Sequence, residues 1–335
     1  MLPRATPIVL TSVPVMGMDS LLPEGLEAAV AIDANGAVAW VDGRGADPLG
    51  TFVTDTTANP RVVRFGQRGG GPGELQNPWF ISLPAEGPLV FESSGRRLAQ
   101  YARDGSVSAD RSIGYVVGLV DSHALVTTWD DDATLFSVAP GRLQQRRRLT
   151  LESDSLWRDI SMRARARNRA EPYAASIRGD TVYIASTISG DLFRVVAGQR
   201  TTRFGSPVPP RIRTAQELDT ILALMARPMR GPRGELVRPV LSPESVERAR
   251  TVPIRQTSPF TGLQIDGEGR MWRFRDANNG PVADIFRDTV MVQQLALPCS
   301  PLPRGAHVSG RWLILACADS PDRSDRDVVL YRFRF

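Results

Sequence analysis

Short apolar runs, separated by tight polar turns, recur along the whole chain. Residues 62–103 show the pattern most clearly, with strand-like segments at 79–83, 88–92 and 97–102. The turns between them are rich in Gly, Ser and Asp. Short β-rich runs at this spacing, bounded by turn residues, are typical of antiparallel strands. The pattern therefore predicts an all-β chain.

The same unit, an inner strand followed by a polar turn and a second strand, can be aligned in six copies. The copies lie at residues 29–41, 79–92, 116–129, 173–184, 261–274 and 306–315. Repeated units of four short strands are typical of propeller blades. We therefore expect a six-bladed β-propeller, in one domain spanning residues 1–335.

The last copy lacks one strand. Only residues 328–335 follow it, whereas an unassigned strand-like segment lies at residues 7–13. We expect this N-terminal segment to complete the C-terminal blade, because pairing the two ends removes exposed sheet edges and fixes both termini.

Two long insertions, residues 152–172 and 206–259, interrupt the repeat, and both are expected on the same face of the propeller. The second, between blades 4 and 5, is predicted to be partly helical. Residues 214–217 have the spacing of a capping box, and a second short helix is expected to start at residues 242–244, with Ser242 as its cap and Pro243 at its first position. After the capping box, one helical face collects Leu218, Ile221, Leu222 and Met225. The insertion either pads the rim of the propeller or docks a partner.

The first insertion combines one tryptophan with a row of arginines: Trp157, Arg158, Arg163, Arg165, Arg167 and Arg169. Its acidic residues come early and its arginines late, an order that suits the dipole of a helix. Such a cluster could bind an acidic protein surface or lipid headgroups. A solvated helix end is the alternative explanation.

Residues 66–78 form a glycine-rich loop between the first two copies. The loop and its first flanking residue resemble a phrase found between blades of bacterial six-bladed propellers related to NHL-repeat proteins. The matching residues are Phe65, Gly66, Gly69, Gly71, Pro72, Gly73, Glu74, Leu75 and Pro78. Glycines allow positive φ and close backbone approach where one blade leads to the next. A phosphate loop is not indicated, because no helix start and no Lys-Ser/Thr pair follow. We include Arg68 and Glu74 among the expected partner-binding residues.

Composition narrows the classes of protein. The chain has 335 residues, of which 42% are hydrophobic, and its 41 basic residues, all arginine, are nearly balanced by 36 acidic ones. The net charge of +5 comes without the basic stripe, interleaved with aromatics, of a nucleic-acid binder. No apolar run reaches transmembrane length, and no convincing signal peptide is visible. The family resemblance nevertheless favours a location outside the cytoplasm.

The residues that could carry chemistry are few. Cys299 and Cys317 could form a disulfide or remain two buried thiols, and they lack the spacing of a metal site. The two histidines are His123, expected in a turn, and His307, expected on an innermost strand, where it could be a catalytic or a core residue. The inner strands are poor in acids and no nucleophile elbow is present.

We therefore expect no catalytic residues, no metal and no cofactor. The predicted function is that of a non-enzymatic binding or scaffold propeller that docks a protein partner. Extrinsic subunits of bacterial membrane complexes can be of this kind. The alternative is a hydrolase, similar to propeller lactonases and esterases, with a metal in the central channel.

Overall fold

The structure is a computed structural model. It describes residues 9–12, 28–43, 48–53, 61–93, 96–112, 115–120, 123–127, 132–139, 142–150, 173–178, 181–186, 192–196, 199, 201–205, 214–215, 218–219, 222–223, 226, 229–230, 236–237, 240–251, 263–277, 280–302, 304–318 and 328–335. Throughout residues 115–150 and 173–178 only the backbone is described.

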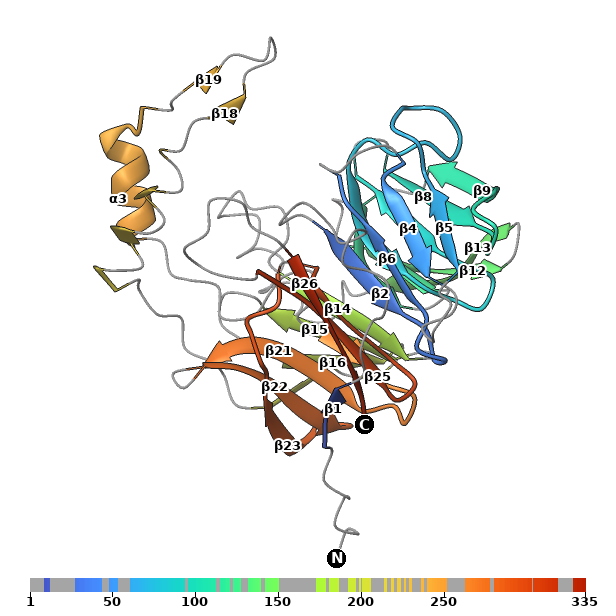
Figure 1. Cartoon of the computed structure of the whole chain (residues 1–335). Helices are drawn as coiled ribbons and strands as arrows, with labels where there is room; N and C mark the ends of the chain where they lie inside the picture. Colours follow the sequence, from blue (N-terminus) through green and yellow to red (C-terminus); the bar gives the residue numbers. More distant parts are fainter. Residues whose placement is uncertain are drawn as a thin grey trace, which may run out of the picture.

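The described strands form six four-stranded antiparallel sheets (Figure 1). The first three sheets are β2 (Ala29–Ile32), β3 (Val38–Val41), β4 (Gly50–Val53) and β5 (Val62–Phe65); β6 (Pro78–Ser82), β7 (Leu89–Glu92), β8 (Arg97–Tyr101) and β9 (Val107–Ser112); and β10 (Tyr115–Val120), β11 (His123–Thr127), β12 (Asp132–Ala139) and β13 (Arg142–Thr150).

The remaining sheets follow the same plan. They are β14 (Tyr173–Arg178), β15 (Thr181–Ser186), β16 (Leu192–Val196) and β17 (Thr202–Phe204); β20 (Leu263–Ile265), β21 (Met271–Ala277), β22 (Gly280–Arg287) and β23 (Val290–Ala296); and β24 (Ala306–Ser309), β25 (Trp312–Ala318), β26 (Val328–Arg334) and β1 (Thr11–Ser12).

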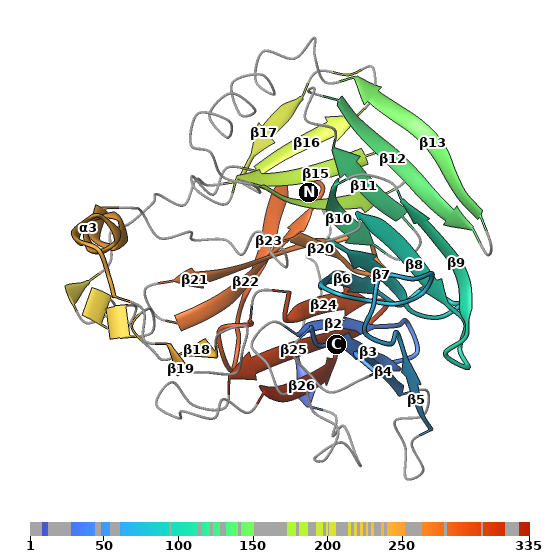
Figure 2. The same cartoon turned by 90° about the horizontal axis from the view of Figure 1, so that it is seen from above.

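The first strands of these sheets lie beside one another around a common centre (Figure 2). In chain order β2, β6, β10, β14, β20 and β24 each contact the next, and β24 contacts β2. Sheets of four short strands arranged radially in this way define an all-β propeller.

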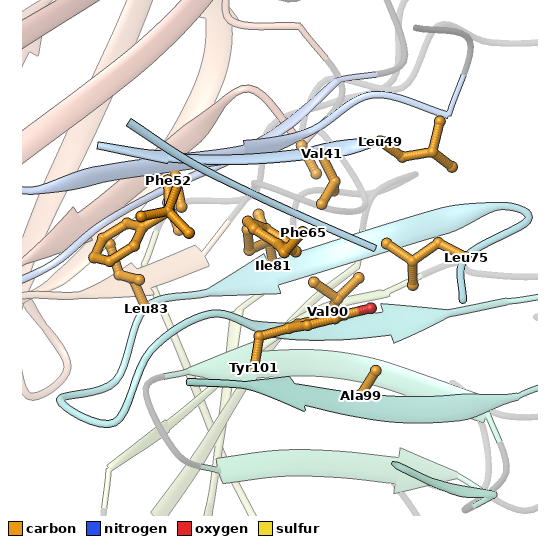
Figure 3. Packing of buried hydrophobic residues seen from close by; sticks show 14 of the residues in the cluster. Val41, Leu49, Phe52, Phe65, Leu75, Ile81, Leu83, Val90, Ala99 and Tyr101 are labelled. Carbon is orange, nitrogen blue, oxygen red and sulfur yellow. The ribbon is translucent and has the colours of Figure 1, made fainter. Parts of the chain in front are cut away.

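The strands near the centre consist of unbroken apolar runs, because neighbouring sheets cover both faces of the sheet to which each strand belongs. β2 and β3 are buried at all positions, whereas the outermost strand β9 is mostly exposed or half-buried. Sheets covered on one face only would instead alternate apolar and polar residues. Figure 3 shows one of the resulting cores, in which Phe52 of the first sheet packs near Leu83 and Ile81 of the second.

The tight turns between first and second strands are closed by aspartates. In the first sheet Asp33 Oδ1 accepts hydrogen bonds from the backbone N–H of Asn35 and Ala37, at 2.8 and 2.9 Å. In the fifth sheet Asp266 Oδ1 accepts from the N–H groups of Glu268 and Arg270, both at 2.9 Å. An aspartate that bonds the backbone two residues on fixes a turn locally. The predicted turns at these two places are confirmed.

The N-terminal strand completes the C-terminal sheet, as expected. β1 pairs antiparallel with β26, with Thr11 opposite Arg334 and Ser12 opposite Phe333. The paired part is two residues long, shorter than the segment 7–13 that the sequence suggested. Residues 7 and 8, and residue 13, lie outside the described part of the chain.

The second insertion contains the short helix that was predicted to start at residues 242–244. α3 (Pro243–Thr251) has Pro243 at its first position, and the Ser242 hydroxyl accepts a hydrogen bond from the N–H of Ser245 at 3.1 Å. The insertion also contains a two-stranded sheet of β18 (Met229–Arg230) and β19 (Leu236–Val237), which the sequence did not suggest. Insertion 152–172 lies outside the described residues.

Candidate functional site

The glycine loop folds back on itself between β5 and β6. Leu75 N–H donates to the Gln67 carbonyl at 2.8 Å, and Gly69 N–H donates to the Leu75 carbonyl at 3.1 Å. The Leu75 side chain is fully buried and packs on the core between the first two sheets (Figure 3). The loop is therefore anchored at its middle by an apolar side chain and closed by its own backbone.

Arg97, at the start of β8, occupies the inside of this loop. Its guanidinium donates to the carbonyls of Gly71 and Glu74, both at 2.8 Å, and to Asp110 Oδ2 at 3.2 Å. Asp110 in turn accepts the N–H of Gly73 at 2.6 Å. Arginine suits this position because its planar guanidinium can donate to several acceptors at once.

The phenol of Tyr101 closes the other side of the loop. Its hydroxyl donates to the Gly73 carbonyl at 2.8 Å. Burial raises the pKa of Tyr101, and the neighbouring Asp110 carboxylate raises it further. The tyrosine is therefore neutral at physiological pH and acts here as a hydrogen-bond donor.

The two loop residues expected to bind a partner have different surroundings. Arg68 is exposed and donates to the Gly43 carbonyl at 3.3 Å. Glu74 is half-buried, and its Oε2 accepts the N–H of Gly71 at 2.7 Å. The Glu74 carboxylate thus closes the loop from within, and a contact by either residue with a partner stays a prediction.

A second arginine, Arg304, joins three sheets where β6 begins. Its guanidinium lies 4.9 Å from the centre of the Trp79 ring, and its carbonyl accepts the N–H of Val30 at 3.2 Å. Its backbone φ is 69°, a conformation uncommon outside glycine. Sequence reasoning missed this contact, because nothing local links Arg304 to a tryptophan 225 positions earlier.

The expected apolar stripe of the second insertion is described only in part. The N–H of Leu218 donates to the Thr214 carbonyl at 2.9 Å and that of Ala226 to the Leu222 carbonyl at 3.0 Å, as in a helix. Leu218 and Leu222 are half-buried. The other expected binding residues lie outside the described residues: Ile221, Met225, Trp157, Arg158, Arg163, Arg165, Arg167 and Arg169.

His307 lies on β24, as the sequence suggested, but it faces a neighbouring strand. Its Nδ1 accepts the backbone N–H of Ile32 at 3.3 Å, and the side chain is buried. Burial lowers the pKa of His307 to about 4. The histidine therefore links the last sheet to the first in its neutral form. His123, which was expected in a turn, is the first residue of β11 instead.

A buried ion cluster in the fifth sheet was not foreseen. Asp284, fully buried, accepts hydrogen bonds from Arg273 and Arg275, both at 2.6 Å, and from the Gln294 amide at 2.7 Å. Burial alone would raise the pKa of Asp284, but these donors outweigh it and the pKa is lowered. Both oxygens of the carboxylate accept hydrogen bonds from side chains of the same sheet, so we interpret the cluster as structural.

The two cysteines are joined. A disulfide links Cys299, in the segment before β24, to Cys317 of β25, with Cα atoms 6.2 Å apart, a separation within the usual range. In the part of the chain that the structure describes, no three His, Cys, Asp or Glu residues are grouped as metal ligands. None of the described helices is long and apolar enough to span a membrane.

Comparison with known proteins adds a likeness of fold. No family model and no curated protein matches the chain. A member of the DUF4221 family from Bacteroides vulgatus is 10% identical, with 97% of this chain and 98% of that chain covered and a TM-score of 0.46. A putative 6-phosphogluconolactonase from Bacteroides fragilis is 11% identical, covering 87% and 77%, with a TM-score of 0.43. A streptogramin B lyase is 10% identical, covering 93% and 84%, with a TM-score of 0.42.

Identities this low concern the fold alone, and we base no inference about activity on them. The class of the chain, an all-β propeller, is defined by its own sheets. The more specific resemblance to NHL-related propellers stays a prediction, because no family model matches.

Proposed function

We propose that this propeller is a non-enzymatic binding protein that docks a protein partner through its second insertion. One observation carries the proposal: α3 stands away from the six sheets in two perpendicular views (Figures 1 and 2), and β18 and β19 stand away from them in Figure 1. The ring of inner strands closes without them. Ordering such an appendage costs conformational entropy, so a contact made by it would compensate that cost.

The surface of the appendage is suited to a protein partner. Val240, just before α3, is 96% exposed. On α3 the exposed charges form pairs along the helix, Arg248 with Glu244 at 3.3 Å and Arg250 with Glu247 at 3.7 Å. An exposed apolar residue next to charges of both signs can supply burial and orientation in one interface.

The scaffold that carries this insertion is, in our proposal, a closed ring of six blades. Each four-stranded sheet is one blade, and the contact between β24 and β2 closes the ring. The insertion then leaves the ring between blades 4 and 5. A more specific form of the function is that of an extrinsic subunit of a membrane-associated complex, outside the cytoplasm, which rests on the resemblance to NHL-related propellers.

A hydrolase with a channel metal has less support among the described residues. His307, its candidate for proton transfer, is buried and bonded to the backbone of Ile32. The buried Asp284 is bonded to two arginines of its own sheet.

The proposal is tested by site-specific photo-cross-linking in an extract of the native host. A cross-linking residue is placed at Val240 in one protein and at Asp104, exposed in the turn between β8 and β9, in a matched control. We expect a discrete cross-linked protein with the Val240 variant and none with the Asp104 variant. The same bait lacking residues 206–259, replaced by a short Gly/Ser linker, should lose that protein. If the deleted form retains the same partner with unchanged affinity, the proposal is wrong.

A further inference from the structure

A short segment before β24 lies where the last sheet meets the first two, and we call its residues 299–302, 304 and 305 the Cys299 segment. The disulfide joins the first residue of this segment to Cys317 of β25. Further along, the N–H of Leu302 donates to the Ala316 carbonyl at 2.9 Å, and the Gly305 carbonyl accepts the N–H of Ala316 at 2.6 Å. The segment is therefore fixed to two adjacent positions of β25, residues 316 and 317.

Arg304, near the end of the Cys299 segment, connects it to the first two sheets. Its carbonyl accepts the N–H of Val30 on β2 at 3.2 Å, and its guanidinium lies 4.9 Å from the centre of the Trp79 ring on β6. These contacts lie at the joint between β24 and β2, where the ring of inner strands closes (Figure 2). The φ of Arg304 is 69°, and such a backbone conformation persists only where the surrounding structure imposes it. Whatever fixes the Cys299 segment to β25 therefore also keeps Arg304 in contact with the first two sheets.

We infer that the Cys299–Cys317 disulfide is a redox-sensitive switch at this joint. In the oxidised form the disulfide and the backbone bonds to Ala316 together keep Arg304 at positive φ. Reduction removes the covalent constraint, so Arg304 relaxes to a negative φ, and its carbonyl leaves Val30 while its guanidinium leaves Trp79. The redox state of the two cysteines thus sets how firmly the last sheet is joined to the first two.

The two sulfur atoms differ in accessibility, which determines the route of reduction. Cys299 is half-buried, whereas Cys317 is 1% exposed. A thiolate of a dithiol reductant therefore attacks the Sγ atom of Cys299, the bond between the cysteines breaks, and Cys317 leaves as a thiolate that takes up a proton. The second thiol of the reductant then displaces Cys299, so the protein gains two electrons and two protons while the dithiol becomes a disulfide.

Hydrogen exchange of the folded whole chain, measured by mass spectrometry with and without dithiothreitol, tests the proposal. Alkylation with iodoacetamide establishes by mass that both cysteines are reduced. We expect reduction to accelerate exchange at the amides of Val30 and Leu302 about tenfold or more, because both hydrogen bonds depend on the Cys299 segment and local opening suffices to break them. The amides of Leu49 and Asp266, which donate to the carbonyls of Gly66 and Arg270 at 2.9 and 3.0 Å, are the controls and should be unchanged. Reoxidation with diamide should restore slow exchange.

The double variant Cys299→Ser/Cys317→Ala should exchange rapidly at Val30 and Leu302 whether or not dithiothreitol is present. The wild-type chain decides the question even if this variant does not fold, because its two redox states are compared in one protein. Unchanged exchange at Val30 and Leu302 in the fully reduced chain overturns the proposal. So does equal acceleration at Leu49 and Asp266, which would make the disulfide a constraint on the whole fold, or a disulfide that dithiothreitol reduces only in denaturant.

Discussion

The glycine loop was expected to contact a partner, and α3 belongs to the insertion that we propose as the docking surface, but the polar groups of the two regions are used in opposite ways. In the loop, Arg97 donates to two backbone carbonyls and a carboxylate, and Glu74 accepts a backbone N–H of the same loop. On α3, the Arg248–Glu244 pair has side chains that are 71% and 84% exposed. The loop satisfies its own hydrogen bonds, whereas α3 presents its charges to solvent.

This difference separates a structural feature from a docking surface. In the sequence, a glycine loop with charged residues resembles a ligand-binding site. In the structure, however, the hydrogen-bond donors of Arg97 are already bonded to carbonyl groups of the protein itself and are not available to a ligand. Breaking such bonds leaves buried groups unsatisfied, which costs stability. Replacing an exposed charged residue changes the free energy of unfolding little. Such a substitution should therefore act mainly on the affinity for a partner. The two regions should therefore respond oppositely to mutation.

Among these substitutions, Arg97→Ala is expected to reduce the free energy of unfolding the most. The substitution removes the donors to Gly71 and Glu74 and leaves Asp110 and Glu92, which are 11% and 2% exposed, without this partner. Removing one member of a buried ion pair typically costs about 3 kcal/mol or more. We expect a loss of that order in the free energy of unfolding, measured by urea denaturation. A loss below about 1 kcal/mol would contradict the structural role of the loop.

His307 offers a pH-dependent probe of the contact between the last sheet and the first. Because its folded pKa is about 4, below the unfolded value near 6.5, only the unfolded chain gains a proton as the pH falls through 6.5. Stability from this group is therefore full above about pH 6.5, and declines until the pH reaches about 4.

Between pH 7 and about pH 5 this decline amounts to about 2 kcal/mol. The measurement is the unfolding free energy of wild type and His307→Gln at both pH values. Glutamine keeps an acceptor for Ile32 N–H but does not titrate, so the variant should lack this part of the pH dependence. Equal slopes in both proteins would mean that His307 is not buried in neutral form.

Gly73→Ala should cost about 1–3 kcal/mol. Gly73 has a φ of 71°, and a Cβ there would collide with the Val107 side chain. Gly70→Ala is the matched control, because its φ is not positive and the nearest obstacle is the flexible end of Gln76, 3.2 Å away. The control should be neutral or slightly stabilising, by up to about 1 kcal/mol. Thermal unfolding of both variants and of Gly73→Ala/Val107→Ala, in which the collision is relieved, checks the assignment.

The fold was largely predictable because its signals are local. Each apolar run, and each aspartate turn such as those at Asp33 and Asp266, is determined by residues that are close together in the sequence. The helix at α3 followed from Ser242 and Pro243 for the same reason. The length of β1 and the sheet of β18 and β19 were not predictable, because short pairings depend on what lies beside them.

The polar contacts were less predictable, because they join distant parts of the chain. Arg97 was read as part of a strand and Glu74 as a surface residue, although the fold places them around one loop. Arg304 and Trp79, or Asp284 and its two arginines, carry no pattern that marks them as partners. The disulfide between Cys299 and Cys317 was foreseen as one of two options, since spacing alone does not decide whether thiols meet.

The smallest effect on stability is expected from Arg248→Ala on α3, and it is the sharpest test of the contrast. Arg248 and Glu244 are one helical turn apart and largely exposed, and such a pair contributes about 0.5 kcal/mol or less. Urea denaturation should therefore barely distinguish the variant from wild type. If α3 docks a partner, the same substitution should lower the yield of the cross-link formed at Val240, and more so at low salt, where charge pairs are less screened. A destabilisation as large as that of Arg97→Ala would show instead that α3 is integral to the fold, and the contrast between the two regions would fail.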